Sequence, residues 1–339
     1  MRNEEEEEIL LKRGYWDETR VFLMPDGSRR VRKSSRAGGP WALAALKKEI
    51  RYLLELPRTV AGRFPPVLKF WGLEDGAESA GYEMPYFSEW TDAGSLVRGG
   101  NWDQSEQSRF AKILGDLVVG ELQESLQGTA LSGHVRTTVK GALDTLAGNQ
   151  EFLDRIESDE IRINDRIFPG LRHAVEAIDR ADLFQELDRQ STRLHGDLIL
   201  ENVLWNPEPT GGQPSLILID PVSVAGIDVG HPAFDLVKYE SYASGELFAI
   251  REEKVILESE GERSWSFQLP EKDPEWNRFR SSGLSEGFRS RWEDRHGPVD
   301  PLVYHLIDGY FSLAMALNTS GRHQQARVLK AIQCFGAVV

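Results

Sequence analysis

The sequence predicts a mixed α+β protein of two lobes, a small β-rich N-lobe with one helix at residues 1–88 and a larger, mainly helical C-lobe at 89–339. Short apolar segments separated by turn residues dominate the first ninety positions. From about Asp92 onward, apolar residues recur instead at helical spacing. A chain of 339 residues is long enough for two separate cores.

The N-lobe is expected to contain several strands and a single helix. The turn Pro25-Asp26-Gly27 separates two of the strands, and Pro57 ends the helix. The strands are predicted at residues 9–11, 20–24, 29–34, 64–68 and 81–87, and the helix at 41–56.

The C-lobe is expected to consist of amphipathic helices that carry one short hairpin. The hairpin is predicted from two apolar runs, 203–205 and 216–219, that are separated by prolines and glycines. Asp300 followed by Pro301 indicates the start of a helix. Helices are predicted at residues 105–126, 135–146, 171–187, 300–317 and 326–335.

The segment His195-Gly196-Asp197 is followed by Asn202, and Asp220 closes the next apolar run. An antiparallel hairpin would bring Asn202 and Asp220 together, because its first strand starts where the second ends. H-G-D alone is common in proteins, and an Asp at a strand end is often only a loop cap. The full set matches a phosphoryl-transfer site, in which one carboxylate orients the attacking hydroxyl and an Asn and a second Asp bind Mg²⁺.

Lys33 and Glu49 are a further candidate pair. Glu49 falls on the apolar face of the helix at 41–56, and a carboxylate there requires a cationic partner. Lys33 shares a strand face with Val31 and is the natural partner. The alternative is that Glu49 reaches solvent beside its helix and Lys33 is one more exposed base in an Arg-rich strand.

Composition limits the classes of partner and compartment. The net charge of −14 disfavours nucleic acid and anionic membranes as partners. The acidic run Glu4 to Glu8 is unlike a secretory signal, and no run of about 18 apolar residues occurs. The single cysteine, Cys334, excludes an internal disulfide. We therefore expect a cytoplasmic protein, with the oligomeric state left open.

Two further segments bear on function. Residues 12–19, between the first two strands, contain only Gly14, so the glycine-rich phosphate flap of protein kinases is missing. Residues 257–297 combine three tryptophans with carboxylates such as Glu258, Glu260, Glu262, Asp273 and Glu275. This segment is interpreted either as an acceptor-binding insertion for a cationic or hydroxyl-rich ligand, or as a surface elaboration whose tryptophans pack locally.

In their order along the chain, these motifs resemble those of the aminoglycoside-phosphotransferase-like kinases, which have a bilobal protein-kinase-like fold. The resemblance rests on Lys33, Glu49, the hinge-like segment 82–86, and the segments 195–202, 219–221 and 230–236. Within that group, residues 161–165 and the Ile-Asp-Pro form of 219–221 are most similar to phosphotransferases of polysaccharide and natural-product gene sets. His231 and Val222 stand where relatives often have an acidic residue and an Arg.

The resemblance implies a role for each site residue. Asp197 is expected to be catalytic, and Asn202 and Asp220 to bind Mg²⁺. Lys33 would contact the nucleotide phosphates and Glu49 would position it. Met84 and Tyr86 in the hinge-like segment complete the residues expected to bind ATP or GTP. Asp235 would brace the catalytic loop, and His195 would organise its backbone.

The expected activity is an ATP- and Mg²⁺-dependent O-phosphotransferase. Its partner would be a small hydroxylated acceptor such as a sugar, an aminocyclitol, an aminoglycoside or another antibiotic or natural product. A role in antibiotic resistance and one in biosynthesis both remain open. The alternatives are a nucleotide-binding pseudokinase or scaffold without transfer activity, and a protein kinase, which the absence of D-F-G, A-P-E and a glycine-rich flap disfavours.

Overall fold

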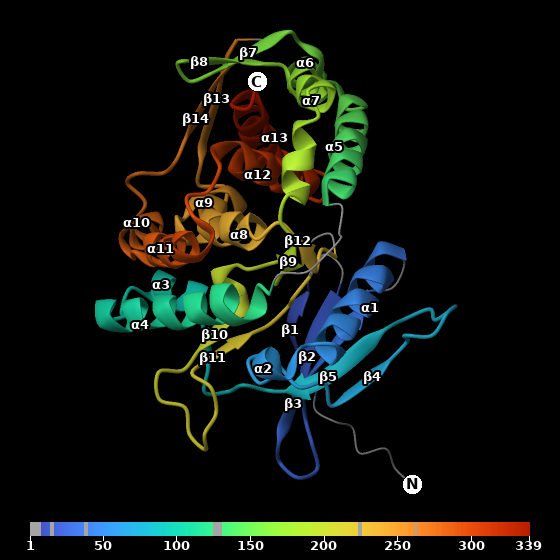
Figure 1. Cartoon of the computed structure of the whole chain (residues 1–339), viewed down its shortest axis with the longest axis vertical. Helices are drawn as coiled ribbons and strands as arrows, with labels where there is room; N and C mark the ends of the chain where they lie inside the picture. Colours follow the sequence, from blue (N-terminus) through green and yellow to red (C-terminus); the bar gives the residue numbers. More distant parts are fainter. Residues whose placement is uncertain (1–7, 14–16, 37–39, 125–130, 223–225, 262) are drawn as a thin grey trace.

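The N-lobe is built on a five-stranded antiparallel sheet with strand order β1-β2-β3-β5-β4 (Figure 1). The computed structural model describes residues 8–13, 17–36, 40–124, 131–222, 226–261 and 263–339. The acidic run before Glu8 and the flap residues 14–16 therefore lie outside the described residues. The five strands are β1 (Glu8–Arg13), β2 (Asp17–Leu23), β3 (Arg29–Ser35), β4 (Lys69–Trp71) and β5 (Gly81–Pro85).

One long helix covers the N-terminal sheet, as predicted. This helix, α1 (Pro40–Leu54), contacts β3 and β5. Leu46 and Ile50 on its inner face are buried in the core that includes Tyr82 of β5. The short helix α2 (Arg58–Ala61) follows. The strand predicted at 64–68 is wrong: two consecutive prolines there lack backbone N–H groups, and the strand begins only at Lys69.

The C-lobe is mainly helical, as predicted (Figure 1). The α-helices are α3 (Ala93–Gly99), α4 (Gln104–Gly115), α5 (Leu131–Ala147), α6 (Gln150–Glu157), α7 (Leu171–Arg180), α8 (Ala233–Ala243), α9 (Glu246–Arg251), α10 (Pro274–Ser281), α11 (Leu284–His296), α12 (Pro301–Ala316) and α13 (Gly321–Gly336). Asp300 caps α12 by accepting a hydrogen bond from Leu302 N.

Two predicted helices are interrupted. The helix at 171–187 is split into α7 and the 3₁₀ turn η2 (Leu183–Asp188), because Asp182 between them has a left-handed backbone with φ of 56°. The helix at 105–126 changes to the π-helical segment η1 (Asp116–Leu122) after α4. Residues 125 and 126 lie outside the described residues.

Three small sheets support the helices. The strands β10 (Val203–Trp205) and β11 (Leu216–Leu218) form the predicted antiparallel hairpin, and β6 (Thr91–Asp92) pairs with β10. The chain thus crosses between the lobes after β5, where the boundary at 88 and 89 stays a prediction. The remaining strands are β9 (Thr192–Arg193) with β12 (Val229–Gly230), and β7 (Glu160–Ile163), β8 (Arg166–Pro169), β13 (Ile256–Gly261) and β14 (Ser264–Gln268) in one sheet.

The segment 257–297 forms the β13–β14 hairpin followed by α10 and α11, and it does not stand apart from the C-lobe. Trp276 and Trp292 are buried in the core, and α11 packs against α4 and α8. The local-packing interpretation of these two tryptophans therefore agrees with the structure.

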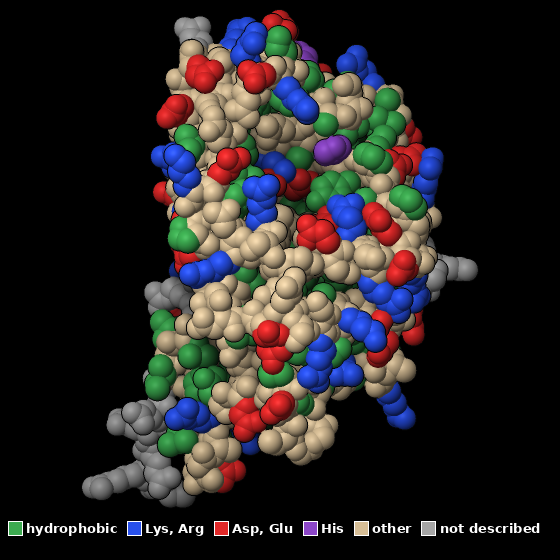
Figure 2. Space-filling view, turned by 90° about the vertical axis from the view of Figure 1, so that its left-hand side faces the viewer, with side chains coloured by type: hydrophobic (Ala, Val, Ile, Leu, Met, Phe, Trp, Pro, Cys, Tyr) green, Lys and Arg blue, Asp and Glu red, His purple; other side chains and the backbone are tan. Residues whose placement is uncertain are grey.

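Charged side chains of both signs cover the face shown in Figure 2. Lys and Arg are interspersed there with Asp and Glu, although the whole chain has a net charge of −14. Among the described residues, no helix combines the length and apolar character that a membrane crossing requires.

Candidate active site

A buried carboxylate fixes the backbone of the loop at residues 195–202, which carries Asp197. This loop is referred to below as the catalytic loop, after its expected role. Asp235, at the start of α8, accepts hydrogen bonds from the backbone N–H groups of His195 and Gly196, each at 2.9 Å. Gly196 has φ of +80°, and a Cβ there would lie 2.2 Å from Ile227 O. Only glycine fits at this position without strain. The structure thus places Asp235 where the resemblance expects a brace for the loop.

Asp197 is held from two sides. Asn202 Nδ2 donates to the backbone oxygen of Asp197 at 2.9 Å and to its Oδ2 at 3.2 Å. Lys238 Nζ, on α8, lies 3.1 Å from Asp197 Oδ1. Both Asp197 and Lys238 are more than nine-tenths buried. The carboxylate is therefore fixed in one orientation by groups that favour its charged form.

The hairpin brings Asn202 and Asp220 together, as the sequence predicts. Val203 and Leu218 are register partners, and Ile219 N donates to Asn202 O at 2.9 Å. Asp220 follows directly, with a left-handed φ of 54° that turns the chain out of the hairpin. Because the Asn202 amide nitrogen binds Asp197, the amide oxygen is left for a different partner. An amide oxygen and a carboxylate are ligands that suit Mg²⁺.

Within the described ranges, no cluster of three or more His, Cys, Asp or Glu side chains is arranged to hold a metal ion. Asn202 and Asp220 would supply two of the ligands of a metal ion bound there. Phosphate oxygens and water are the usual additional ligands of Mg²⁺ in such two-ligand sites.

Lys33 is fully buried and shared among three carboxylates. Its Nζ lies 2.9 Å from both carboxylate oxygens of Glu49, 2.9 Å from Asp220 Oδ1 and 3.4 Å from Asp17 Oδ2. Glu49 also accepts a hydrogen bond from Tyr82 OH at 2.8 Å. The predicted pairing of Lys33 with Glu49 is present. Burial opposes the charge of Lys33, but Asp220 and Glu49 outweigh it and raise the pKa well above the usual value.

Three carboxylates around one ammonium leave this part of the site negatively charged, which suits a divalent cation.

The sequence interpretation missed Asp17. The register of β2 and β3 explains its position: Thr19 is opposite Lys33, and Asp17 lies two residues from Thr19 on the same face of the sheet.

The two expected hinge residues lie at the end of β5. Met84 is buried and pairs in register with Val31 of β3, while Tyr86 is half-buried and its N–H donates to Arg29 O at 3.2 Å. Met84 lies in β5 and Tyr86 directly follows it, where the chain leaves the N-terminal sheet (Figure 1). Contact with a nucleotide base remains a prediction for both.

His195 is a structural part of the loop. Its ring stacks on Phe64 with centroids 6.1 Å apart, and its Nδ1 accepts a long hydrogen bond of 3.4 Å from Asp197 N. Burial lowers the pKa of His195 to about 4, so the ring is neutral at pH 7. This agrees with the expected role in organising the loop backbone.

Lys238, Glu201 and Arg251 are polar neighbours of Asp197 that the sequence interpretation missed. Glu201 accepts hydrogen bonds from Tyr242 OH at 2.6 Å and from Arg251 at 2.8 Å. A signal for Lys238 was present, because Asp235, Lys238 and Tyr242 recur at helical spacing on one face of α8.

The carboxylates of segment 257–297 do not contact Asp197. Glu258 and Glu260 lie on β13, at the far end of the C-lobe from β9 and β10, which flank the catalytic loop (Figure 1). Asp273 and Glu275 pair instead with Lys254, at 2.9 Å for Asp273. Glu262 lies outside the described residues.

Residues 10–255 match the family model described as the phosphotransferase enzyme family, APH. The chain belongs to the APH family. Its fold is similar to that of APH(2″)-IIIa in complex with GDP and kanamycin, with a TM-score of 0.52, 16% identity, and coverage of 98% of this chain and 92% of that chain. A thermostable mutant of aminoglycoside phosphotransferase APH(4)-Ia, with AMP-PNP and hygromycin B, has a TM-score of 0.52 at 12% identity and coverage of 97% and 93%. No curated protein matches the chain significantly.

The APH family has the architecture that the structure shows, with an N-terminal antiparallel sheet followed by a mainly helical region. The fold prediction is therefore confirmed. The family match covers the N-lobe strands, Lys33, Glu49 and the catalytic loop, and it ends in the segment after α9. At these low identities the solved structures establish the fold and leave the acceptor open.

Proposed function

We propose that this protein of the APH family is an ATP- or GTP-dependent and Mg²⁺-dependent O-phosphotransferase acting on a hydroxyl of a small molecule. The observation that carries the proposal is the convergence of Lys33, Asp220 and Asn202, from both lobes, beside the fixed carboxylate of Asp197. Two of the similar structures contain GDP or AMP-PNP together with an aminoglycoside or hygromycin B.

Each residue has one task in the proposed reaction. Asp197 accepts a hydrogen bond from the acceptor hydroxyl and aligns its oxygen for in-line attack on the γ-phosphorus. As the new O–P bond forms and the bond to the β-phosphate oxygen breaks, the hydroxyl proton passes to Asp197. Lys33, positioned by Glu49, neutralises charge on the phosphates.

The residues expected to bind the nucleotide base and the metal ion lie next to those that act on the phosphates. Met84 and Tyr86 would line the base site, and Asn202 and Asp220 would hold Mg²⁺ through hard oxygen ligands. A Mg²⁺ ion bound there supplies charge neutralisation for the transferring phosphoryl group. The excess of carboxylates around Lys33 supports this assignment.

The acceptor is expected among sugars, aminocyclitols, aminoglycosides and other natural products. The test is incubation with ATP or GTP, Mg²⁺ and a panel of such compounds, with mass spectrometry for a product heavier by one phosphoryl group. A product that forms only with the complete mixture supports the proposal. Nucleotide binding without a product across the panel would instead support a pseudokinase or scaffold.

A further inference from the structure

Basic side chains from three helices pair with Asp197 and Glu201 of the catalytic loop. Lys238 of α8 forms an ion pair with Asp197 at 3.1 Å. Arg251 of α9 lies 2.8 Å from one carboxylate oxygen of Glu201, and Arg98 of α3 lies 4.0 Å from the other. Glu201 belongs to the same loop as Asp197, four residues further along the chain.

A fourth cation comes from α13. Arg327 donates to His323 Nε2 at 3.3 Å, and both Arg327 and Arg251 act electrostatically on Lys238. Burial lowers the pKa of Lys238, Asp197 opposes this effect, and the two arginines add to it. Arg251 and Arg327 are thus close enough to Lys238 to influence its charge. Of these six charged side chains, four are basic and two, Asp197 and Glu201, are acidic.

The two sides of Asp197 therefore differ in charge. On the nucleotide side, one ammonium is shared by three carboxylates. On the opposite side, basic groups outnumber the acidic groups of the loop. This second side would face an acceptor, because the acceptor must reach Asp197 without displacing the phosphates.

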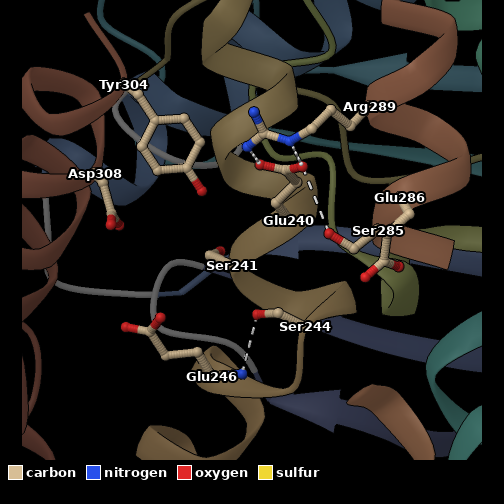
Figure 3. A pocket seen from close by; sticks show the side chains of 9 residues that line it. All are labelled: Glu240, Ser241, Ser244, Glu246, Ser285, Glu286, Arg289, Tyr304 and Asp308. Atoms are coloured by element: carbon tan, nitrogen blue, oxygen red, sulfur yellow. Dashed lines mark hydrogen bonds and ion pairs between the residues drawn. The ribbon is translucent and has the colours of Figure 1, made fainter. Parts of the chain in front are cut away.

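The acidic hollow shown in Figure 3 does not change this balance. It is lined by Glu240, Glu246, Asp308 and neighbouring residues of α8, α9, α11 and α12. Glu240 is bonded to Arg289, and Glu246 and Asp308 share Lys330. Glu240 is two residues, or about 200° of helical rotation, from Lys238 on α8, so the Glu240 side chain lies on a different face of the helix, although Ser241, which also lines the hollow, lies within one turn of Lys238.

The basic side is also open to a ligand. The side chains of Arg251 and Arg98 are 37% and 35% exposed, whereas that of Lys238 is 7% exposed. Both arginines pair with Glu201, so an anion bound here would compete with Glu201 for Arg251. Guanidinium groups bind carboxylates and phosphates through two parallel hydrogen bonds, and an ammonium adds a compact charge.

We propose that the acceptor carries an anionic group, a carboxylate or a phosphate, that is bound by Lys238 and Arg251 while Asp197 orients its hydroxyl. This inference rests on the proposed function and narrows its acceptors to acidic or phosphorylated sugars and natural products, which excludes the cationic aminoglycosides and aminocyclitols. An anion bound to Lys238 shares the ammonium with Asp197. The Asp197 carboxylate is then less tightly held by Lys238 and is more readily available to accept a hydrogen bond from the hydroxyl of the acceptor molecule.

The test uses inorganic phosphate and acetate as separate probes on the full chain saturated with Mg·AMP-PNP, which fills the nucleotide site. Thermal shift at constant ionic strength measures the Kd of each anion. The variants are Arg251→Gln, Glu201→Gln and the control Arg172→Gln, which removes a paired arginine of α7 bound to Glu157 and Asp144.

Wild-type protein is expected to bind at least one probe saturably. Arg251→Gln should weaken binding by at least about tenfold, because it removes a charge-assisted hydrogen bond to the anion. Glu201→Gln should tighten binding, because it removes the charge that competes for Arg251 while its amide oxygen still accepts from Tyr242. Arg172→Gln should match wild type. A stronger response to acetate indicates a carboxylate acceptor, and a stronger response to phosphate indicates a phosphorylated one.

Two results would overturn the inference while the proposed function stands: no binding of either anion despite a normal Mg·AMP-PNP shift, or equal weakening in Arg251→Gln and Arg172→Gln. Weakening by Glu201→Gln would also overturn it, because damage to the loop and not charge would then explain the data. Absence of the Mg·AMP-PNP shift from wild type would count against the proposed function itself.

Discussion

Lys33 Nζ lies 2.9 Å from Asp220 Oδ1, although the two residues are 187 positions apart in the sequence. The contact joins β3 of the N-lobe to the end of the β10–β11 hairpin in the C-lobe. Glu49, from α1, binds the same ammonium. One buried cation thus connects the residues proposed for nucleotide and metal binding. The effects of substitutions at Lys33, Glu49 and Asp220 on stability should therefore depend on one another.

Replacement of Lys33 by Met should destabilise the fold by about 3 kcal/mol, because Glu49 is then buried without its cation. The double variant Lys33→Met/Glu49→Gln should recover part of that loss, since no charge remains to be compensated. Urea denaturation of both single variants and the double variant measures the coupling. A loss in the double variant equal to the sum of the losses in Lys33→Met and Glu49→Gln would show that the two side chains are not coupled.

Asp220→Ala should abolish the increase in melting temperature that Mg·ATP gives the wild-type protein. A ligand that binds only the native state stabilises it in proportion to ln(1 + [L]/Kd), so loss of a metal ligand removes the shift. Asp144→Ala, an exposed position on α5, serves as the control and should keep the shift. A full Mg·ATP shift in Asp220→Ala would remove this residue from the metal site.

Gly196→Ala should lower stability by roughly 2–4 kcal/mol, combining positive φ with a clash against the backbone oxygen of Ile227. Gly211→Ala is the matched control, because Gly211 also has positive φ but has no atom within 4 Å of an added Cβ. That variant should lose only about 1 kcal/mol. Similar losses in the two variants would mean that the catalytic loop can move away from Ile227.

Acid should destabilise the protein partly through His231. Burial lowers the pKa of His231 to about 4, and its Nδ1 accepts a hydrogen bond from Ala233 N at 3.2 Å. Because the pKa is lower in the folded state than the usual 6.5, this stability is present above pH 6.5 and is lost as the pH falls towards 4.

The protonation of His231 lowers the free energy of unfolding by at most about 3 kcal/mol. His231→Asn keeps an acceptor for Ala233 without titrating, so its free energy of unfolding should fall less between pH 7 and pH 4.5. Urea denaturation at several pH values measures both slopes. Identical slopes for wild type and His231→Asn would show that His231 titrates alike in the folded and unfolded chains.

Local patterns were sufficient to predict the pairing of Lys33 with Glu49 and the convergence of Asn202 and Asp220. Hydrophobic periodicity placed Glu49 on the inner face of its helix, and the paired apolar runs predicted that Asn202 and Asp220 converge. Both relationships follow from the regular geometry of one helix or one hairpin. Both relationships could therefore be predicted from the sequence alone, without information on tertiary packing.

The basic groups around Asp197 and Glu201, which we propose bind the acceptor, depend on packing between elements and were not predicted. Arg251, Arg98 and Arg327 come from three helices whose relative positions no local pattern specifies. The carboxylates of 257–297 were grouped by their proximity in sequence, but β13 joins β7 in a separate sheet and α10 contacts α3 and α9. The strand predicted at 64–68 failed for a local reason, the two prolines.

The central claim is tested most directly by ³¹P NMR of wild type and Asp197→Asn incubated with ATP, Mg²⁺ and the acceptor panel. The amide keeps the shape of Asp197 and removes the carboxylate that orients the hydroxyl. Wild type should give equal amounts of ADP and a new phosphate monoester. Asp197→Asn should bind Mg·ATP with an unchanged thermal shift and lose nearly all of the ester. A variant that forms the ester at the wild-type rate would contradict the assignment of Asp197.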